Sequence, residues 1–226
     1  MLRSTTVNLC LLAVFLMPSL AQNTKVQKLS LTPASLEAIN TRVEPVNYRG
    51  KKAIRLLPLA GKEQSDEAML AVLTGSNFTD GSIELEVSGA PRADAKPNMR
   101  GFIGLAFRVQ GPGEKFECFY LRPSNGRAND QLMRNHSLQY LSAPDYGWQR
   151  LRNETPGVYE SYADLIPGEW TKMKIVVSGA TAQLYVNGAP QPALVVNDLK
   201  LGNSSGAIAL WSHTSTDGYF ANLTVK

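Results

Sequence analysis

The segment between Arg122 and Arg152 is the part of the chain richest in side chains that could bind or act on a polar ligand. It is long, polar and without the alternation of a strand, and a connection of this length in a compact domain is usually functional or mobile. Disordered segments are poor in aromatic residues, so its tyrosines and its tryptophan argue against simple mobility. Together with Arg108 on an earlier strand, the candidate ligand-binding residues are Arg122, Asn125, Arg127, Asp130, Gln131, Arg134, Asn135, Tyr140 and Trp148.

These side chains combine two properties that a sugar site needs. Arginine and asparagine are planar hydrogen-bonding groups that can pair with neighbouring hydroxyls, while tyrosine and tryptophan offer an aromatic face to the C–H side of a sugar ring. Several arginines would also recognise a carboxylate or a sulfate, because a guanidinium group binds such anions through two parallel hydrogen bonds. The segment therefore predicts a glycan partner, acidic glycans included. The alternative is a structural loop held by its own arginine–aspartate pairs and a small aromatic core.

Two residues could transfer protons. His136 is one of two histidines in the chain, and it would need a partner carboxylate such as Asp130 for acid or base work. Glu117 stands between apolar neighbours on a strand-like run, and burial would raise its pKa and allow it to act as a general acid. Each also has a structural interpretation. His136 would then be an ordinary polar side chain, and Glu117 would pair with Arg108 or Arg122, because buried carboxylates are normally paired.

The sequence excludes several other kinds of site. His136 and His213 are far apart in the sequence and lack carboxylates at a matching spacing, which argues against a metal site for zinc. Cys10 lies in the N-terminal apolar run, so Cys118 is the only cysteine of the mature chain and cannot form an internal disulfide. The apolar neighbours of Cys118 indicate a small buried side chain. The net charge of +4 is a mild excess without a dense basic stripe, so no nucleic-acid partner is expected.

The N-terminus predicts export. A basic residue precedes the apolar run Leu9–Met17, and Ser19 and Ala21 have the spacing that a signal peptidase requires, so residues 1–21 are predicted to be a signal peptide. The run is shorter than the roughly 20 residues that cross a bilayer, and no later stretch is apolar enough to span a membrane. The expected localisation is secreted or periplasmic. Residues 22–226 have the length of one β-sandwich domain.

The mature chain has the pattern of short strands separated by turns. Apolar and polar residues alternate over 83–87, 103–109, 173–177 and 182–186, which is typical of half-buried strands. In the second of these runs the odd-numbered residues are assigned to the core, and Arg108 to the opposite face. The dipeptide that follows the last run, Asn187-Gly188, predicts a tight hairpin because both of its positions tolerate positive φ.

The arrangement of these elements indicates the fold class. Residues 41–46 and 52–57 predict a hairpin around Tyr48-Arg49-Gly50, and Ser35–Ile39 is the one helix-like stretch. Strands do not alternate with long helices, which excludes a parallel α/β fold. Many short strands closed by Gly, Asn and Asp turns predict an all-β protein, a two-sheet antiparallel jelly-roll sandwich.

Five segments resemble a known superfamily in their order along the chain. They are FTDGSIE at 78–84, GLAFR at 104–108, WT at 170–171, LYVNG at 184–188 and GAIALW at 206–211. Residues 70–226 resemble the concanavalin A-like lectins and glucanases in their laminin G-like branch, near a bacterial group linked to 3-keto-disaccharide hydrolases. The resemblance implies a curved pair of antiparallel sheets whose concave face binds a sugar. It also implies a structural calcium ion, for which Asp80, Asp217 and Asn222 are faint ligand candidates.

The resemblance leaves three functional hypotheses, because this superfamily contains lectins, glycosidases, lyases and spacer domains. The first is a secreted glycan-binding module that uses the residues named above. The second is a hydrolase or lyase acting on glycosides, 3-keto-glycosides included, with His136 or Glu117 transferring the proton and Arg108 or Arg134 stabilising negative charge. Glucanase chemistry is not expected, because the Glu-x-Asp-x-x-Glu strand of those enzymes has no match at Glu84-Leu85-Glu86. The third is a spacer or adhesion domain.

Overall fold

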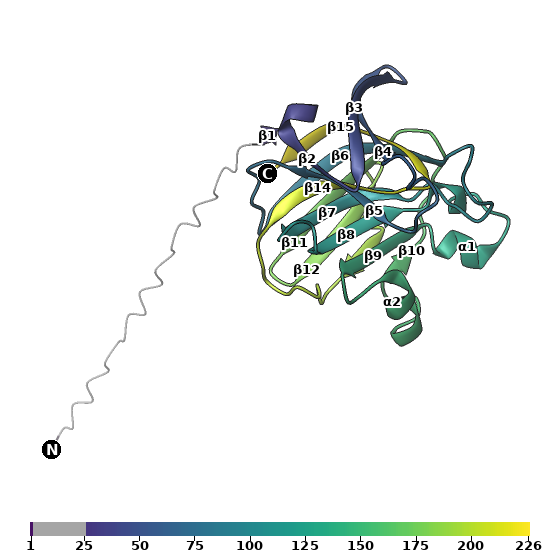
Figure 1. Cartoon of the computed structure of the whole chain (residues 1–226). Helices are drawn as coiled ribbons and strands as arrows, with labels where there is room; N and C mark the ends of the chain where they lie inside the picture. The colour runs from purple at the N-terminus through teal and green to yellow at the C-terminus, as the bar shows by residue number, and fades with distance from the viewer. Residues whose placement is uncertain (2–25) are drawn as a thin grey trace.

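Two antiparallel sheets stacked face to face form the part of the chain that this computed structural model describes, Met1 and residues 26–226 (Figure 1). The prediction of an all-β, two-sheet antiparallel sandwich is confirmed. The signal peptide predicted over residues 1–21 lies outside the described residues except for Met1. Within 26–226, none of the helices has both the length and the apolar character needed to cross a membrane.

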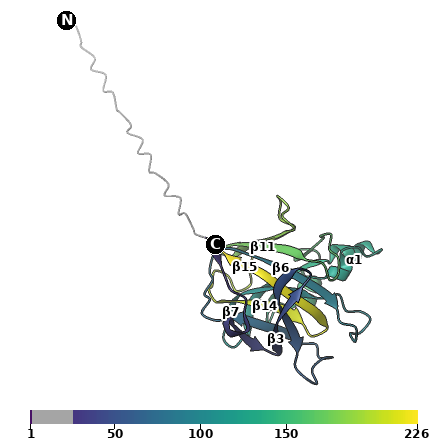
Figure 2. The same cartoon turned by 90° about the horizontal axis from the view of Figure 1, so that it is seen from above.

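Each sheet mixes strands from distant parts of the sequence. Across sheet A the order is β13 (Leu194–Val196), β12 (Thr181–Val186), β11 (Thr171–Ser178), β6 (Gly81–Pro91), β15 (Thr216–Val225), β4 (Lys51–Pro58) and β3 (Thr41–Tyr48), with β1 (Gln27–Lys28) also beside β15. Across sheet B it is β10 (Glu160–Ser161), β9 (Leu138–Ala143), β8 (Lys115–Leu121), β7 (Ile103–Gln110), β14 (Ala207–His213), β5 (Ala68–Leu73) and β2 (Leu36–Ile39). Figure 2 shows β11, β6 and β15 of sheet A in one layer, with β7 and β14 of sheet B beneath them.

Four short helical segments lie in the connections. They are the 3₁₀ turns η1 (Pro33–Ser35) and η2 (Pro123–Asn125) and the helices α1 (Gln131–Asn135) and α2 (Trp148–Glu154). The two α-helices lie beside β9 and β10 at one edge of sheet B (Figure 1). Two connecting segments of the chain thus gather at the same edge of the sandwich.

The core lies between the sheets, where the alternation seen in the sequence becomes two apolar faces. Ile83, Leu85 and Val87 of β6 are buried, as the alternation predicts, and they pack in one cluster with Ile103 and Leu105 of β7. Each such side chain contributes about 1.5–3 kcal/mol through burial. The strand β13 pairs back on β12 as predicted, but residues 187–193 connect the two strands, so the hairpin is longer than the tight one expected at Asn187-Gly188.

Two predictions about local structure were wrong. The helix-like stretch Ser35–Ile39 is instead the end of η1 followed by β2, because Leu36–Ile39 pairs with β5 as an edge strand of sheet B. The segment 122–152, expected to lack strands, contains β9 between β8 and β10. The pairing of β9 in the sheet, not its own alternation of residues, determines its conformation.

A bulge near the end of β7 changes the faces on which its last residues lie. Arg108 has a φ of 54°, and the pairing with β8 shifts register between Phe107 and Gln110. Val109 therefore packs in a cluster on the outer face of sheet B, not in the core with Phe107. Arg108 is 0% exposed, so the expectation that it lies on the open floor of a site is wrong.

The guanidinium group of Arg108 joins three loops at one end of the sandwich. It donates to the carbonyl oxygens of Thr79 at 2.8 Å, Gly179 at 2.7 Å and Gly202, and it lies 3.2 Å from Asp80 Oδ1. These loops precede β6, join β11 to β12, and lead into β14. Arg108 thus joins two connections between the sheets to the turn between β11 and β12.

Glu117 and Tyr140 form a second buried polar contact, on the inner face of sheet B. The Tyr140 hydroxyl donates to Glu117 Oε2 at 2.6 Å, and the amide of Leu201 donates to Oε1 at 2.7 Å. Burial raises the pKa of Glu117 above its ordinary value, against the opposing effect of these hydrogen bonds. The expected pairing with Arg108 or Arg122 is absent from the ion pairs of the described residues.

Replacing Arg108 should destabilise the sandwich. We expect Arg108→Ala to lower the free energy of unfolding by about 3–5 kcal/mol, because buried carbonyls and Asp80 lose their partner. Urea unfolding followed by circular dichroism measures the change. The matched control is Arg127→Ala, which removes an exposed ion pair with Asp164 and should cost about 1 kcal/mol or less. Equal effects of the two substitutions would contradict a structural role for Arg108.

Glu117 should make stability depend on pH. Its folded pKa lies above its unfolded value, so its stabilising contribution is complete below pH 4.5 and is lost as the pH rises through the folded pKa. We expect Glu117→Gln to remove this decline. Between pH 4 and 7 the unfolding free energy of the wild type should therefore fall relative to that of the variant. Urea titrations at several pH values test the slope. Parallel curves for the two proteins would show that Glu117 titrates normally.

Candidate functional site

A cavity of about 640 Å³ lies against the outer face of sheet B. Tyr120 of β8 and Trp211 of β14 stack on each other over its floor, with ring centroids 4.8 Å apart. Gly104 lies between them in the sheet, and a Cβ at that position would come within 2.7 Å of the Tyr120 side chain. The absence of a side chain at Gly104 therefore allows the two aromatic rings to meet.

The walls of the cavity come from loops and helices that are far apart in the sequence. The loop before β7 supplies one wall, the connection through η2, α1 and α2 supplies another, and the ends of β5 and β14 close the far side. The lining residues used below are Asp66, Arg100, Phe102, Tyr120, Arg122, Asn125, His136, Trp148, Arg152, Trp211 and His213.

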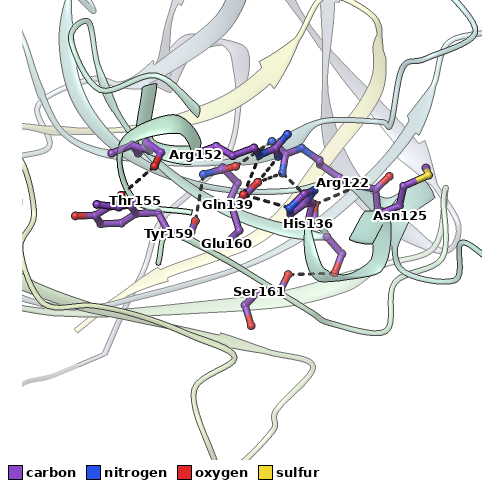
Figure 3. Close-up of polar contacts among 12 residues, drawn as sticks. Arg122, Asn125, His136, Gln139, Arg152, Thr155, Tyr159, Glu160 and Ser161 are labelled. Atoms are coloured by element: carbon purple, nitrogen blue, oxygen red, sulfur yellow. Dashed lines mark hydrogen bonds and ion pairs between the residues drawn. The ribbon is translucent and has the colours of Figure 1, made fainter. Parts of the chain in front are cut away.

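A buried carboxylate organises one end of the cavity (Figure 3). The Glu160 side chain on β10 is only 2% exposed, and it accepts hydrogen bonds from Arg122 at 3.3 Å and from Arg152 through both of its oxygens. His136 Nε2 lies 3.4 Å from Glu160 Oε2. A buried carboxylate is stable only when it is paired and hydrogen-bonded, so these three partners are held by the charge of Glu160.

His136 follows α1 directly and lines the cavity. Its carbonyl oxygen accepts hydrogen bonds from Arg122 at 3.0 Å and from Asn125 at 3.2 Å, which fixes the backbone from which the ring projects. Burial lowers the pKa of the imidazole below its ordinary value of 6.5, and Arg152 and Arg122 act in the same direction against the carboxylate of Glu160. Burial and the two arginines thus favour the neutral imidazole, which is the form able to accept a proton.

Arg122 and Arg152, the two arginines beside Glu160, differ in how many of their N–H donors are free to bind a ligand. Arg122 donates to Glu160, to the His136 carbonyl, to Tyr120 at 2.8 Å and to Gln139 at 3.0 Å, so four of its five N–H groups are occupied. Arg152 directs its described hydrogen bonds to Glu160 alone. Arg122 therefore positions the site, while Arg152 keeps donors that can meet a ligand.

Trp148, at the start of α2, completes this end with an aromatic surface. Its ring lies 4.7 Å from the guanidinium carbon of Arg152 and 5.7 Å from that of Arg122. Such cation–π contacts hold an indole in place without burying it, and Trp148 remains 36% exposed. A planar apolar face thus lines the same cavity as the imidazole of His136 and the free guanidinium donors.

The opposite end of the cavity is also polar. His213 Nε2 lies 2.9 Å from Asp66 Oδ1, and its Nδ1 accepts from the amide of Ser215 at 3.1 Å. The Nδ1 contact requires the hydrogen of a neutral ring to be on Nε2, facing Asp66. Phe102 packs edge-on against His213 with centroids 5.4 Å apart, and against Tyr120 at 6.2 Å. Aromatic rings therefore connect the two polar ends.

The structure brings together four of the residues expected from the sequence: Arg122, Asn125, His136 and Trp148 all line the cavity. Sequence analysis missed Glu160 and Arg152, although Arg152 marked the end of the segment of interest. Glu160 gave no local signal, because its strand has two residues and its partners are distant in sequence. A Glu in an otherwise polar loop becomes recognisable only when its burial is known.

The remaining expected site residues do not line the cavity, and each has a structural partner. The exposed ones belong to α1 and its surroundings, where Asp130 caps the helix by accepting from the Met133 amide at 2.7 Å. The others in this group pair locally: Arg127 with Asp164, Gln131 with Asn135, and Arg134 with Tyr162. Arg108, Glu117 and Tyr140 are buried away from the cavity. The residues at and around α1 thus form the local polar pairs that a structural loop would have.

The residues proposed for calcium are held apart in the structure. Asp80 contacts Arg108 and the Gly179 amide, Asp217 pairs with Arg55, and Asn222 donates to Glu86. Among residues 26–226, no three His, Cys, Asp or Glu side chains lie close enough together to hold a metal ion. The proposed set of calcium ligands is therefore corrected.

Comparison with known proteins supports this fold. A carbohydrate-binding module, CBM66, from Bacillus subtilis has a TM-score of 0.57 at 12% sequence identity, with 85% of this chain and 96% of that chain covered. A protein of unknown function with a galectin-like fold, also from Bacillus subtilis, has a TM-score of 0.55 at 13% identity, with coverage of 85% and 89%. The exoplasmic/lumenal domain of VIP36, in its Ca²⁺/Man-bound form, has a TM-score of 0.56 at 8% identity, with coverage of 85% and 82%.

These likenesses are too distant in sequence to show more than a concanavalin A-like sandwich. No curated protein matches the chain. A family match is more specific, because residues 46–226 match the family described as 3-keto-alpha-glucoside-1,2-lyase-like domain. That match spans most of the chain and includes the whole cavity, and the chain therefore belongs to the family of 3-keto-alpha-glucoside-1,2-lyase-like domains.

Proposed function

We propose that this protein cleaves 3-keto-glycosides by 1,2-elimination, with His136 as the general base. The observation that carries the proposal is a neutral imidazole in the cavity, backed by the buried Glu160 and next to an arginine with unused donors. A base of this kind needs a pKa near or below the working pH, and burial supplies that condition here. Membership of the lyase-like family supports the same reaction class.

The reaction requires one proton acceptor and one group that stabilises negative charge. The carbonyl at C3 of the sugar acidifies the hydrogen on C2, and the imidazole of His136 removes that hydrogen as a proton. The electron pair of the C2–H bond forms an enolate across C2 and C3, with the negative charge on the C3 oxygen. The enolate then forms the C1–C2 double bond and expels the aglycone oxygen from C1, and this oxygen takes up a proton. The products are an enone and the free aglycone.

Arg152 is positioned to stabilise the enolate oxygen. Its described hydrogen bonds go only to Glu160, so it can donate to a new oxyanion without losing a structural contact. Preorganised donors of this type are usually the largest single contribution to catalysis. Glu160 stabilises the imidazolium that forms when His136 accepts the proton. This assignment replaces Arg108 and Arg134, the arginines expected from the sequence, because neither lines the cavity.

The aromatic residues supply the binding surface for the sugar. Trp148 presents an exposed ring beside His136, and the stacked rings of Tyr120 and Trp211 form the floor. Sugar rings bury their C–H faces against such surfaces, while their hydroxyls need donors and acceptors from polar neighbours.

The compartment belongs to the same proposal. The basic, apolar and small-residue order of residues 1–21 supports a signal peptide and a secreted or periplasmic enzyme. An exported glycoside lyase would act on sugars outside the cytoplasm. Mass spectrometry of the mature N-terminus would test the expected cut after Ala21.

His136 should be required for turnover. We expect His136→Ala to lower kcat by about 10²–10⁴-fold on phenyl 3-keto-α-glucoside, because the proton on C2 loses its acceptor. In the wild type, kcat/KM should rise with pH through a pKa below 6.5 and then level off, and the variant should lose this limb. Ultraviolet absorbance of the enone product follows the reaction.

The control for His136 is Glu117→Gln, which changes the other candidate proton-transfer residue but lies outside the cavity. It should keep the wild-type kcat and the same pH limb. Turnover that persists in His136→Ala would contradict the proposal. A sugar product without the C1–C2 double bond at the earliest times would indicate hydrolysis in place of elimination.

The second candidate function is a glycan-binding module without catalysis, favoured by the exposed face of Trp148 in an open cavity. We expect Trp148→Ala to weaken the affinity for a glycoside about tenfold or more, because the sugar loses its stacking surface. Its melting temperature should change little, since the ring is held by two guanidinium contacts at the surface.

Calorimetry with phenyl α-glucoside, which lacks the C3 carbonyl, measures this binding apart from turnover. An unchanged affinity in the folded Trp148→Ala variant would remove Trp148 from the site. Binding without any enone product from the 3-keto-glycoside would favour the module over the lyase. Neither binding nor product would favour the spacer or adhesion domain, although an open cavity argues against a face blocked by bulky side chains.

A further inference from the structure

Arg100 is the one cavity-lining arginine that has no ion-pair partner among the residues that the structure describes. The single described hydrogen bond of its side chain is a long one, 3.4 Å, from Nη1 to the carbonyl oxygen of the neighbouring Met99. Arg122 and Arg152, by contrast, both bind the carboxylate of Glu160. Most N–H donors of Arg100 are therefore available to the cavity.

The charges around the cavity do not balance. Three guanidinium groups, those of Arg100, Arg122 and Arg152, face two carboxylates. One carboxylate is Glu160, which the other two arginines share, and the second is Asp66, whose described partner is His213. Arg100 is partly exposed and can stay hydrated without a ligand, and a ligand that carries negative charge would form charge-assisted hydrogen bonds with its free donors.

The backbone fixes Arg100 at the cavity wall. Its carbonyl oxygen accepts a hydrogen bond from the Ser124 amide in η2 at 3.2 Å, which ties the loop before β7 to the segment that carries His136. Gly101 follows with a φ of 73°, and a Cβ there would lie 2.9 Å from the Cα of Ala90. The loop thus turns tightly against the end of β6, and Arg100 is presented by a rigid backbone.

From the unpaired guanidinium and the surplus of positive charge, we infer that Arg100 recognises an anionic group on the substrate, so that the preferred glycosides are acidic ones. A carboxylate or a sulfate fits the planar fork of arginine through two parallel hydrogen bonds. This inference rests on the proposed elimination for its kinetic test, but its binding test is independent of it. Arg100 would determine specificity and take no part in the proton transfer.

The kinetic test compares Arg100→Gln with the wild type on three substrates. They are phenyl 3-keto-α-glucoside, which is neutral, 4-carboxyphenyl 3-keto-α-glucoside, which carries its acid on the aglycone, and phenyl 3-keto-α-glucuronide, which carries it on the sugar. For one acidic substrate we expect KM to rise about tenfold or more in the variant, while its kcat changes little. The neutral substrate should be unaffected. Each substrate is compared with itself across the two proteins, so differences in leaving-group reactivity cancel.

The matched control is Arg92→Gln in the same loop. Arg92 is paired with Asp94 through two hydrogen bonds and does not line this cavity, so its variant should treat all three substrates as the wild type does. The acidic substrate that responds to Arg100→Gln shows where the anion lies. If neither responds, or if the neutral substrate loses as much as the acidic ones, the inference is overturned and the proposed lyase activity still stands.

The binding test separates failure of this inference from failure of the proposed function. 4-Carboxyphenyl α-glucoside and phenyl α-glucuronide have no C3 carbonyl and cannot undergo the elimination. Calorimetry should show one of them binding more tightly than phenyl α-glucoside, with the advantage lost in Arg100→Gln and kept in Arg92→Gln. That result would support Arg100 as the residue that binds the anionic group, even if no 3-keto-glycoside were cleaved. Equal affinities of the wild type for all three ligands would contradict it.

Discussion

Glu160 imposes the constraint on which the candidate site depends. A carboxylate at 2% exposure must be compensated, and its partners come from the end of β8, from α2 and from the residue after α1. One buried charge therefore joins an edge strand of two residues to three other elements. The same contacts place His136 against the cavity and occupy Arg122, and they leave donors of Arg152 free. The side chain of Glu160 therefore both holds these elements together and supports the proposed chemistry.

The sheet beneath the site contributes in a different way. A sandwich requires only its inner faces to be apolar, yet sheet B also has an apolar cluster on its outer face, including Ala106, Cys118 and Tyr120. Gly104 leaves room for the rings of Tyr120 and Trp211 to stack, and both rings line the cavity. The loops that cover this face leave the cavity between them. Cys118 is buried in this layer, as its apolar neighbours predict.

The sequence is informative about the fold where one face of a strand faces water. Alternation in β6 and β11 identified the core residues, and Asn187-Gly188 identified its hairpin with φ values of 52° and 74°. It is uninformative where tertiary contacts overrule local pattern. The bulge at Arg108 depends on loop carbonyls that only the folded chain assembles, and β9 is a strand because β8 and β10 pair with it.

The site follows the same rule. A count of polar and aromatic residues indicated a segment that contributes to the cavity wall, but it could not separate Arg122, which lines the cavity, from Arg127, which pairs with Asp164 at the surface. Both have the same chemistry, and only burial and partners distinguish them. The distinction matters for function, because an arginine whose donors are all engaged cannot bind a ligand through them. Arg152 keeps donors beyond those that it directs to Glu160, and Arg100 has no ion-pair partner among the described residues. The proposed roles of both arginines, in stabilising an oxyanion and in binding an anion, depend on these remaining donors.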